Sequence, residues 1–478
     1  MFKKTSLFLG ILVFLSLAST PLCFSQSDSV IATISVGTYP RDLVYNPNNN
    51  KIYCANEISG NVTIIDGTGD SVITTVEVGN YPYVLVHNPI DDRIFCANFR
   101  SHSVSIIDGT GDSVITTVEV GNYPSALVHN SANNKVYCAN QGSDNVTIID
   151  GAGDSVITTV GVGDRPCALV HNSTNNKVYC ANEGSSNISV LDGVGDSVVA
   201  TIHDAYWPRS LAYNTTNNKI YCATHFYWPA HITVIDGEDD SVVASVRIGA
   251  ALLALTCSPS NNKIYCANIN WDNTWWYNLT IISGANDSVV ATLEVGEYSR
   301  ALAYNLTNNK IYCSNEGTDE VTIIDGAGDS VIATVGVGDH PWALAHNSTN
   351  NKIYCTNTYD SSISVIACST PTLAEQDEQI QVIPNFSLKQ NYPNPFNPVT
   401  RIQYSVDSRQ TPIHTTLKIY NILGQKVKTL VDEPKTGGNH EVIWDGKDDK
   451  GKELASGIYF YQLKAKGFTE TKKMILLK

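Results

Sequence analysis

Residues 51–56 of the chain read KIYCAN, and this stretch decides the fold because close copies of it return seven more times. The cysteine of each copy falls at residues 54, 96, 138, 180, 222, 266, 313 and 355. Successive copies are therefore 42, 42, 42, 42, 44, 47 and 42 residues apart. A regular period of about 42 residues indicates a repeat architecture.

Four segments with strand character make up each repeat. In the unit from Asp70 to Gly111 they read SVITTVEV, YVLVHN, RIFCAN and SVSIID, and turns rich in Gly, Asn, Asp and Pro separate them. β-branched and aromatic residues favour strands, whereas the separating residues favour tight reversals. Four short strands per unit of this length predict one blade of a β-propeller.

The two ends of the repeat region predict how the ring closes. Residues 28–37, DSVIATISVG, form a lone copy of the outermost strand, and the last repeat lacks that strand. If the N-terminal strand completes the last blade, no sheet edge is left at the seam. The sequence therefore predicts an all-β, eight-bladed propeller, with seven blades or two unequal sheets as alternatives.

The repeats resemble the YVTN-type propeller repeat of surface-layer and other exported proteins. KIYCAN or KVYCAN stands where that family has a Tyr-Val-Thr-Asn strand, followed by NVTIIDG, SVIATVGVG and a G-x-x-P turn. We expect this domain to span residues 27–368. Cysteine in place of the family's usual valine is a departure.

Both flanks of the propeller carry export features. Residues 1–26 place Lys3 and Lys4 before a short apolar run, which predicts a secretory signal peptide. Residues 369–385 show no strand alternation and are expected to be a linker. Residues 386–478 contain NYPNPFNPVT, NILGQKV, WDGKDDKG and SGIYFYQL, and they resemble the type A sorting domain of the type IX (Por) secretion pathway.

That second resemblance implies an immunoglobulin-like β-sandwich that is recognised by the outer-membrane type IX secretion machinery. It also implies secretion across the outer membrane, with the protein either extracellular or attached to the cell surface.

Charge distribution narrows the class of partner. Residues 27–370 hold 34 acidic against 14 basic side chains, and residues 371–478 hold 12 against 15. An acidic propeller argues against nucleic acid or an anionic membrane as the main partner.

The eight repeated cysteines allow three interpretations: disulfides, metal ligands or small core residues. Equivalent positions in neighbouring blades are separated by a sheet interface of roughly 10 Å, whereas a disulfide needs Cα atoms within about 7 Å. A zinc site needs four converging ligands, and equivalent positions around a ring diverge. We therefore expect buried hydrophobic packing; pairing of Cys257 with Cys266 across a hairpin stays open.

Two further repeated motifs have simple structural interpretations. The DGxGDSV segments predict tight turns, with calcium binding by their paired aspartates as the alternative; otherwise no cofactor or metal is expected. Their Asp-Ser-Val triplets resemble the O-glycosylation acceptor of bacteria that use this secretion route, at Ser71, Ser113, Ser155 and Ser197. His87, His129, His171 and His346 share a position that tyrosine fills in other blades, which favours packing over a metal ring.

Binding residues are predicted where the repeat is interrupted. Aromatic residues accumulate in the loops of blades five and six and in the turn entering blade five, and such residues suit stacking against sugars or anchoring of a protein; burial by their own loops is the alternative. They are Tyr206, Trp207, Phe226, Tyr227, Trp228, Trp271, Trp275, Trp276 and Tyr277.

A second position, at the start of each predicted innermost strand, carries a different kind of residue from blade to blade and should line the mouth of the central channel. Its residues are Arg41, Tyr83, Ser125, Cys167, Arg209, Leu253, Arg300 and Trp342. Its three arginines could attract an anionic group.

No catalytic motif is recognisable: the sequence has no G-x-S-x-G, no H-E-x-x-H and no phosphate loop before a helix. We therefore expect a non-catalytic protein that binds glycan or protein. A lactonase-like hydrolase that uses the channel mouth and a structural surface-layer or adhesive component are the alternatives.

Overall fold

The computed structural model describes residues 28–224, 230–249, 252–270, 276–369, 387–389, 391, 394–406, 413–435, 438–466 and 468–477. The chain divides into two compact units, Met1–Thr372 and Leu373–Lys478, and each is described by itself. Among the described residues, no helix is long and apolar enough to cross a membrane. The predicted signal peptide and most of the predicted linker lie outside the described residues.

The first four repeats each form one antiparallel four-stranded sheet, and we number these blades in chain order, with strands given from the innermost to the outermost. Blade one holds β2 (Pro40–Asn46), β3 (Lys51–Asn56), β4 (Asn61–Asp66) and β5 (Ser71–Glu77). Blade two holds β6 (Pro82–Asn88), β7 (Arg93–Asn98), β8 (Ser103–Asp108) and β9 (Ser113–Glu119). Blade three holds β10 (Pro124–Asn130), β11 (Lys135–Asn140), β12 (Asn145–Asp150) and β13 (Ser155–Gly161). Blade four holds β14 (Pro166–Asn172), β15 (Lys177–Asn182), β16 (Asn187–Asp192) and β17 (Ser197–Ile202).

The last four repeats follow the same order. Blade five holds β18 (Pro208–Asn214), β19 (Lys219–Thr224), β20 (His231–Asp236) and β21 (Val242–Arg247). Blade six holds β22 (Leu252–Ser258), β23 (Lys263–Asn270), β24 (Trp276–Ser283) and β25 (Ser288–Glu294). Blade seven holds β26 (Ser299–Asn305), β27 (Lys310–Asn315), β28 (Glu320–Asp325) and β29 (Ser330–Gly336). Blade eight holds β30 (Pro341–Asn347), β31 (Lys352–Asn357), β32 (Ser362–Ala367) and β1 (Ser29–Ser35).

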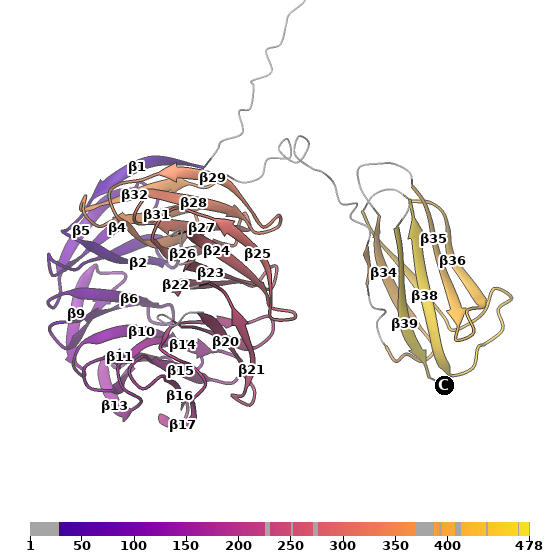
Figure 1. The fold of residues 1–478 in the computed structure, drawn as a ribbon, viewed down its shortest axis with the longest axis horizontal. Coiled ribbons are helices and arrows are strands. Elements are labelled where there is room, and N and C mark those ends of the chain that lie inside the picture. Colours follow the sequence, from indigo (N-terminus) through magenta and orange to yellow (C-terminus); the bar gives the residue numbers. More distant parts are fainter. Residues whose placement is uncertain are drawn as a thin grey trace, which may run out of the picture. The chain divides into compact units, whose positions relative to one another are not determined.

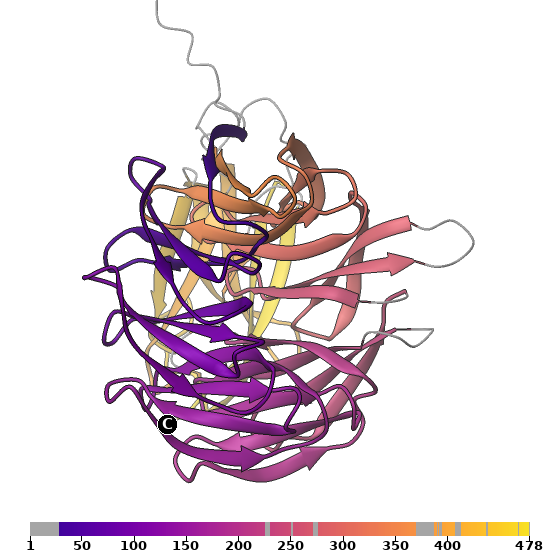
Figure 2. The ribbon, with the colours of Figure 1, turned by 90° about the vertical axis from the view of Figure 1, so that its left-hand side faces the viewer.

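Strand β1 closes the ring as predicted. It pairs antiparallel with β32, so that Ile34 lies opposite Ile363, and Figures 1 and 2 show indigo β1 among the orange strands of the last blade. The innermost strand of blade one, β2, also packs against β30 of blade eight. The described residues therefore form eight blades, and the seven-bladed alternative is wrong.

The KIYCAN strands hold the blades together because both of their faces are buried. In β3, Ile52 and Cys54 pack toward blade eight, whereas Tyr53 and Ala55 pack toward blade two. All four side chains are inaccessible to solvent. The Tyr53 hydroxyl crosses the interface and donates a hydrogen bond to the carbonyl of Gly109 in the next blade, at 3.2 Å.

A ring of ion pairs also joins neighbouring blades. The basic residue that begins each KIYCAN-like strand contacts an aspartate of the next blade, and seven of these aspartates occupy the last position of a DGxGD-type turn, which reads DGEDD in blade five and SGAND in blade six. The pairs are Lys51–Asp112, Arg93–Asp154, Lys135–Asp196, Lys177–Asp240, Lys219–Asp287, Lys263–Asp329, Lys310–Asp28 and Lys352–Asp70. Asp28 immediately precedes β1, so the N-terminal strand provides the aspartate of blade eight in this ring of ion pairs.

The repeated cysteines are buried and unpaired, as expected from the repeat geometry. All eight have no exposed surface, and none of the eleven described cysteines forms a disulfide. Cys257 lies opposite Ile264 and Cys266 lies opposite Leu255, so these two cysteines do not face each other. The Cys54 thiol donates to the Asn56 side-chain oxygen at 3.5 Å, and this asparagine in turn donates to Thr63 at 2.9 Å. Cysteine thus also supplies a weak polar contact that valine lacks.

The loops divide between two faces of the ring. The turn before each innermost strand lies beside the loop after the KIYCAN strand, since Glu57 N donates to Tyr39 O at 2.9 Å; we call this side the Pro-turn face. The DGxGD turns lie beside the turns after the innermost strands, since Gly67 N donates to Asn50 O at 2.9 Å; we call this side the Asp-Gly face. In the described blades these two kinds of loop therefore lie on one face, whereas the long loops of blades five and six, residues 225–229 and 271–275, lie outside the described residues.

The C-terminal unit is a β-sandwich. One sheet holds β33 (Ser387–Leu388), β34 (Thr400–Val406) and β37 (Gly438–Trp444); the other holds β36 (Lys426–Lys435), β35 (Ile413–Asn421), β38 (Gly457–Ala465) and β39 (Phe468–Leu476). One apolar core lies between the sheets and includes Trp444 and Phe396. The Trp444 indole donates to Lys447 O at 2.9 Å, which fixes the WDGKDDKG turn.

Candidate functional site

On the Asp-Gly face, the DGxGDSV motifs form turns as predicted. Asp66 accepts the backbone N–H groups of Thr68 and Gly69 at 3.0 and 3.1 Å, and Asp70 pairs with Lys352 at 2.7 Å. The two aspartates considered as calcium ligands therefore cap a turn and bind a lysine. The four serines proposed as glycosylation acceptors, Ser71, Ser113, Ser155 and Ser197, are all exposed at the start of outermost strands.

The repeated histidines are half-buried on the innermost strands. His87 Nε2 lies 3.4 Å from Asp92, and His129 Nε2 lies 3.3 Å from Asn134. Burial lowers the pKa of His87, His129, His171 and His346, so the neutral imidazole is favoured. This environment agrees with the packing interpretation.

A stack of alternating aromatic and cationic groups occupies part of the channel mouth. The Arg41 guanidinium lies 4.6 Å from the Tyr83 ring centroid and 4.1 Å from the Trp342 centroid. Arg300 lies 4.3 Å from the same Trp342 ring, and Arg41 also donates to the Tyr83 hydroxyl at 2.9 Å. The predicted channel-mouth set contains five arginine or large aromatic residues, Arg41, Tyr83, Arg209, Arg300 and Trp342. All of these except Arg209 are therefore brought together, from blades one, two, seven and eight.

Carboxylates that were not predicted from the sequence neutralise these arginines. Glu57 lies 3.5 Å from Arg41, and Glu316 is hydrogen-bonded to Arg300. Arg209, the fifth predicted residue, lies apart and pairs with Glu183 at 3.1 Å. Each of the three predicted arginines therefore has a carboxylate partner, and Arg209 does not join the stack.

The other residues of the channel-mouth set have separate roles. Ser125 donates to the Pro166 carbonyl at 3.0 Å, and the Cys167 thiol donates to the Pro208 carbonyl at 3.3 Å. Both contacts join the innermost strands of neighbouring blades. The side chain of Leu253 lies outside the described residues.

The predicted aromatic set is only partly described. Tyr206 and Trp207 are 66% and 38% exposed on the Pro-turn face. Tyr277 was expected to be exposed, but it is buried and packs against Tyr298 with ring centroids 4.8 Å apart. Phe226, Tyr227, Trp228, Trp271 and Trp275, together with the side chain of Trp276, lie outside the described residues.

The Pro-turn face also presents large planar side chains at a backbone conformation that they rarely adopt. In seven blades the residue before the innermost strand has a φ between 47° and 62°: Tyr39, Tyr81, Tyr123, Arg165, Trp207, Tyr298 and His340. On the Asp-Gly face, the described left-handed positions are Asn or Asp, which tolerate this conformation. The sequence shows the repeated aromatic position but not its φ.

Asp42, on the innermost strand of blade one, was not predicted from the sequence as a site residue. It lies on β2, where the other blades carry Val84, Ala126, Ala168, Ser210, Ala254, Ala301 or Ala343. Its carboxylate accepts the Leu85 backbone N–H of the next blade at 2.7 Å. Burial raises its pKa to about 6.

One side-chain group in the described part of the chain has the composition of a metal site. The potential ligand atoms of Asp319, Asp339 and His340 lie within 4.8 Å of one another on the Pro-turn face. Hydrogen bonds within the turn already join them: His340 N donates to Asp319 at 3.0 Å, and His340 Nδ1 lies 2.5 Å from Asp339.

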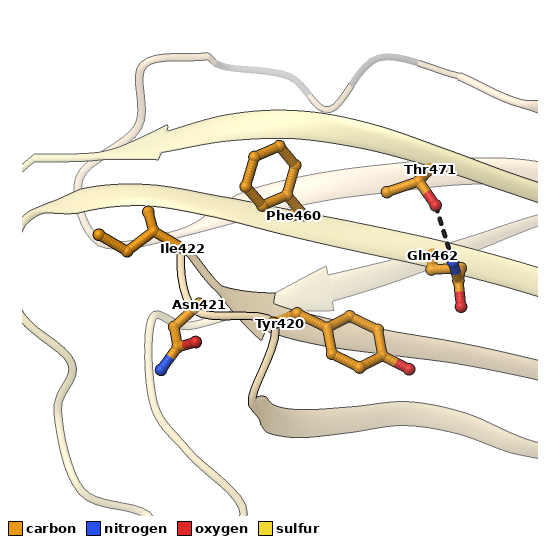
Figure 3. A pocket seen from close by; sticks show the side chains of 7 residues that line it. Tyr420, Asn421, Ile422, Phe460, Gln462 and Thr471 are labelled. Atoms are coloured by element: carbon orange, nitrogen blue, oxygen red, sulfur yellow. Dashed lines mark hydrogen bonds between the residues drawn. The ribbon is translucent and has the colours of Figure 1, made fainter.

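A shallow pocket of about 360 Å³ lies on the four-stranded sheet of the C-terminal sandwich. Figure 3 shows Tyr420, Phe460 and Ile422 around it, with Gln462 donating to Thr471 at 2.9 Å. Ile422 and Leu423, in the NILGQKV turn, are 69% and 75% exposed. This turn therefore presents apolar surface beside the pocket.

Comparison with known proteins finds similar solved structures and two matching families. The chain is similar to Kuenenia stuttgartiensis Hydrazine Synthase, with a TM-score of 0.52 and 20% sequence identity over 60% of this chain and 96% of that chain. At this identity the likeness shows the fold alone. No curated protein matches the chain.

The family matches agree with the two compact units. Residues 400–468, within the C-terminal sandwich, match the FlgD Ig-like domain. Residues 16–306, more than half of the chain, match the YNCE-like beta-propeller. The chain therefore belongs to the YNCE-like β-propeller family.

Proposed function

We propose that this protein is an exported, non-catalytic β-propeller that binds glycan through its Pro-turn face. The observation that carries the proposal is the contrast between the two faces at left-handed turn positions. A left-handed conformation costs roughly 1–2 kcal/mol for a residue with a side chain, and the Asp-Gly face places Asn or Asp there. In the turns before the innermost strands, the Pro-turn face instead carries tyrosine or tryptophan in five blades, and these rings can stack on a sugar. Its other left-handed positions, in the loops after the KIYCAN-like strands, include Asp144, Ser186, Asp319 and Ser361.

Exposure of these rings supports a binding role in addition to packing. Tyr123 packs against Phe99 and His102, with centroids 5.1 and 4.9 Å apart, yet it remains 44% exposed. Tyr298 is 43% exposed, and Tyr359, in the loop after the KIYCAN-like strand of blade eight, is 58% exposed. Aromatic groups that lie partly in solvent around one face suit a carbohydrate or the rim of a protein partner.

Export is the second part of the proposal. The N-terminal segment has the layout of a signal peptide, and the C-terminal sandwich carries the sequence motifs that resemble a type IX sorting domain. Recognition of this sandwich by the secretion machinery would place the propeller outside the outer membrane. Retention of the protein in the periplasm when residues 386–478 are deleted from the chain would support this route, whereas unchanged secretion would contradict it.

The binding proposal is tested by probing the full chain on a glycan array and on intact cells. We expect glycan binding that is lost when Tyr206 and Trp207 are both replaced by Ala. Leu306→Ala is the matched control, because Leu306 is 69% exposed on the Asp-Gly face. Absence of glycan binding by the unmodified chain, or equal loss in the control, would contradict the proposal.

A further inference from the structure

Two arginines on the Pro-turn face share a single buried carboxylate. Arg165 ends the turn into blade four, Arg209 is the second residue of the innermost strand of blade five, and both lie 3.1 Å from Glu183. The Glu183 side chain is 3% exposed, whereas the Arg165 and Arg209 side chains are 54% and 48% exposed. The buried carboxylate therefore orients two guanidinium groups whose remaining N–H donors face solvent.

This arrangement differs from the other arginines of the channel mouth. Arg41 and Arg300 each have their own glutamate, lie against aromatic rings and are less exposed, at 17% and 30%. Burial, together with the Glu183 charge, raises the pKa of the neighbouring Cys167 thiol to about 12, whereas Arg209 and Arg165 act to lower it. One buried carboxylate therefore lies between two guanidinium groups, and the Asp144 carboxylate accepts the Arg165 backbone N–H at 2.8 Å beside them.

Exposed aromatic side chains adjoin these two arginines. Tyr206 and Trp207 immediately precede Pro208 and Arg209 in the chain, and they are 66% and 38% exposed. The Trp207 backbone N–H lies 3.4 Å from the Ser186 hydroxyl, in the loop that follows Glu183. The aromatic pair and the two arginines therefore occupy the same junction between blades four and five.

We infer that this junction binds an acidic saccharide. The inference rests on the proposed glycan-binding function and assigns its ligand class. A sugar ring stacks on Tyr206 and Trp207, and its carboxylate or sulfate group accepts N–H donors from Arg165 and Arg209. Glu183 acts as a positioning residue, because it holds both guanidinium groups toward the same space.

The test compares oligogalacturonide with its methyl ester, which keeps the sugar ring and removes the charge. Binding of each to the full chain is measured by titration calorimetry. We expect the acid to bind at least tenfold more tightly than the ester, since one charge-assisted hydrogen bond contributes about tenfold or more in affinity. Arg165→Gln and Arg209→Gln should each weaken binding of the acid about tenfold and leave binding of the ester unchanged.

Arg247→Gln is the control, because it removes the same charge from an exposed arginine at the end of the outermost strand of blade five. It should leave both affinities within about twofold, and thermal unfolding should show that all three variants remain folded. Arg165→Gln and Arg209→Gln each leave Glu183 with one guanidinium partner, so we expect both variants to remain folded. Inorganic sulfate serves as a third ligand and should bind far more weakly than the oligogalacturonide.

The outcomes separate this inference from the function on which it rests. Equal binding of acid and ester, or an effect of Arg247→Gln equal to that of the junction variants, would overturn the acidic-saccharide assignment and leave glycan binding intact. Sulfate binding as tight as that of the oligogalacturonide would show a site for small anions and would also overturn the assignment. Failure of the chain to bind any glycan, on the array or in titration, would overturn both proposals.

Discussion

At the scale of single residues, alternation along a strand predicts burial well but cannot show which polar contacts a buried atom makes. The positions of Cys54 and its counterparts in the middle of KIYCAN-like strands were enough to predict a core role. The contact from the Cys54 thiol to Asn56 depends on side-chain geometry that periodicity does not encode. For the same reason, Glu57, Glu183 and Glu316 were not predicted as partners of the channel-mouth arginines.

The core thiols should be chemically inert in the folded protein. Burial raises the pKa of Cys54, Cys96 and their counterparts far above that of a free thiol, so almost no thiolate is present at neutral pH. Labelling with a thiol reagent at pH 8 should therefore modify the eight core cysteines only after unfolding in denaturant. Rapid labelling of these cysteines in the native chain would contradict their burial.

Asp42 should make stability depend on pH. Its folded-state pKa of about 6 lies above the ordinary value of 3.8, so the folded state binds more protons between these values. Stability from this group is therefore present at pH 4 and is lost as the pH rises through 6. Asp42→Asn should raise the free energy of unfolding at pH 8 by about 1 kcal/mol or more and have little effect at pH 4, as measured by urea denaturation. An equal effect at both pH values would contradict the shifted pKa.

At the scale of elements, the sequence predicts the strands and turns of the propeller because their residue types and spacing repeat. The backbone conformation of the turns is harder to predict, since tyrosine, tryptophan and arginine are not typical of left-handed positions. The residue before the innermost strand is tyrosine in four blades and tryptophan in one, but only the φ values show that the position is strained. The structure thereby adds Tyr123 and Tyr298 to the candidate binding surface.

Tyr123→Asn tests whether this aromatic position serves binding more than stability. Asparagine relieves part of the left-handed strain, which offsets the lost contacts with Phe99 and His102. We therefore expect the free energy of unfolding to stay within about 1 kcal/mol of the original value, while glycan binding becomes weaker. A large loss of stability with unchanged binding would show that Tyr123 serves packing alone.

At the scale of the whole molecule, eightfold repetition and the lone N-terminal strand were sufficient to predict a closed ring of eight blades. The ring of Lys–Asp pairs was not predicted, because it joins residues about 61 positions apart in different blades. The glutamate partners of the channel-mouth arginines were also not predicted, because sequence spacing does not show which arginine meets which glutamate.

The ion pair between Asp28 and Lys310, where the N-terminal strand joins blade eight, should stabilise the ring more than the more exposed ion pair between Lys51 and Asp112. The side chain of Asp28 is 2% exposed and contacts Lys310, whereas that of Asp112, which contacts Lys51, is 18% exposed. Breaking a buried pair costs roughly 3–5 kcal/mol, whereas a more exposed pair contributes about 1 kcal/mol or less. Asp28→Ala should therefore lower the urea midpoint well below that of Asp112→Ala, and equal midpoints would contradict closure through β1.

Hydroxyl-radical footprinting of the full chain, with and without its best-binding glycan, shows which face binds the glycan. We expect protection of exposed aromatic residues on the Pro-turn face, namely Tyr123, Tyr206, Trp207, Tyr298 and Tyr359. We expect no protection of Val194 or Leu306, which are exposed on the Asp-Gly face. Protection confined to the Asp-Gly face, or no protection on either face under saturating glycan, would contradict the assignment of the Pro-turn face as the binding surface.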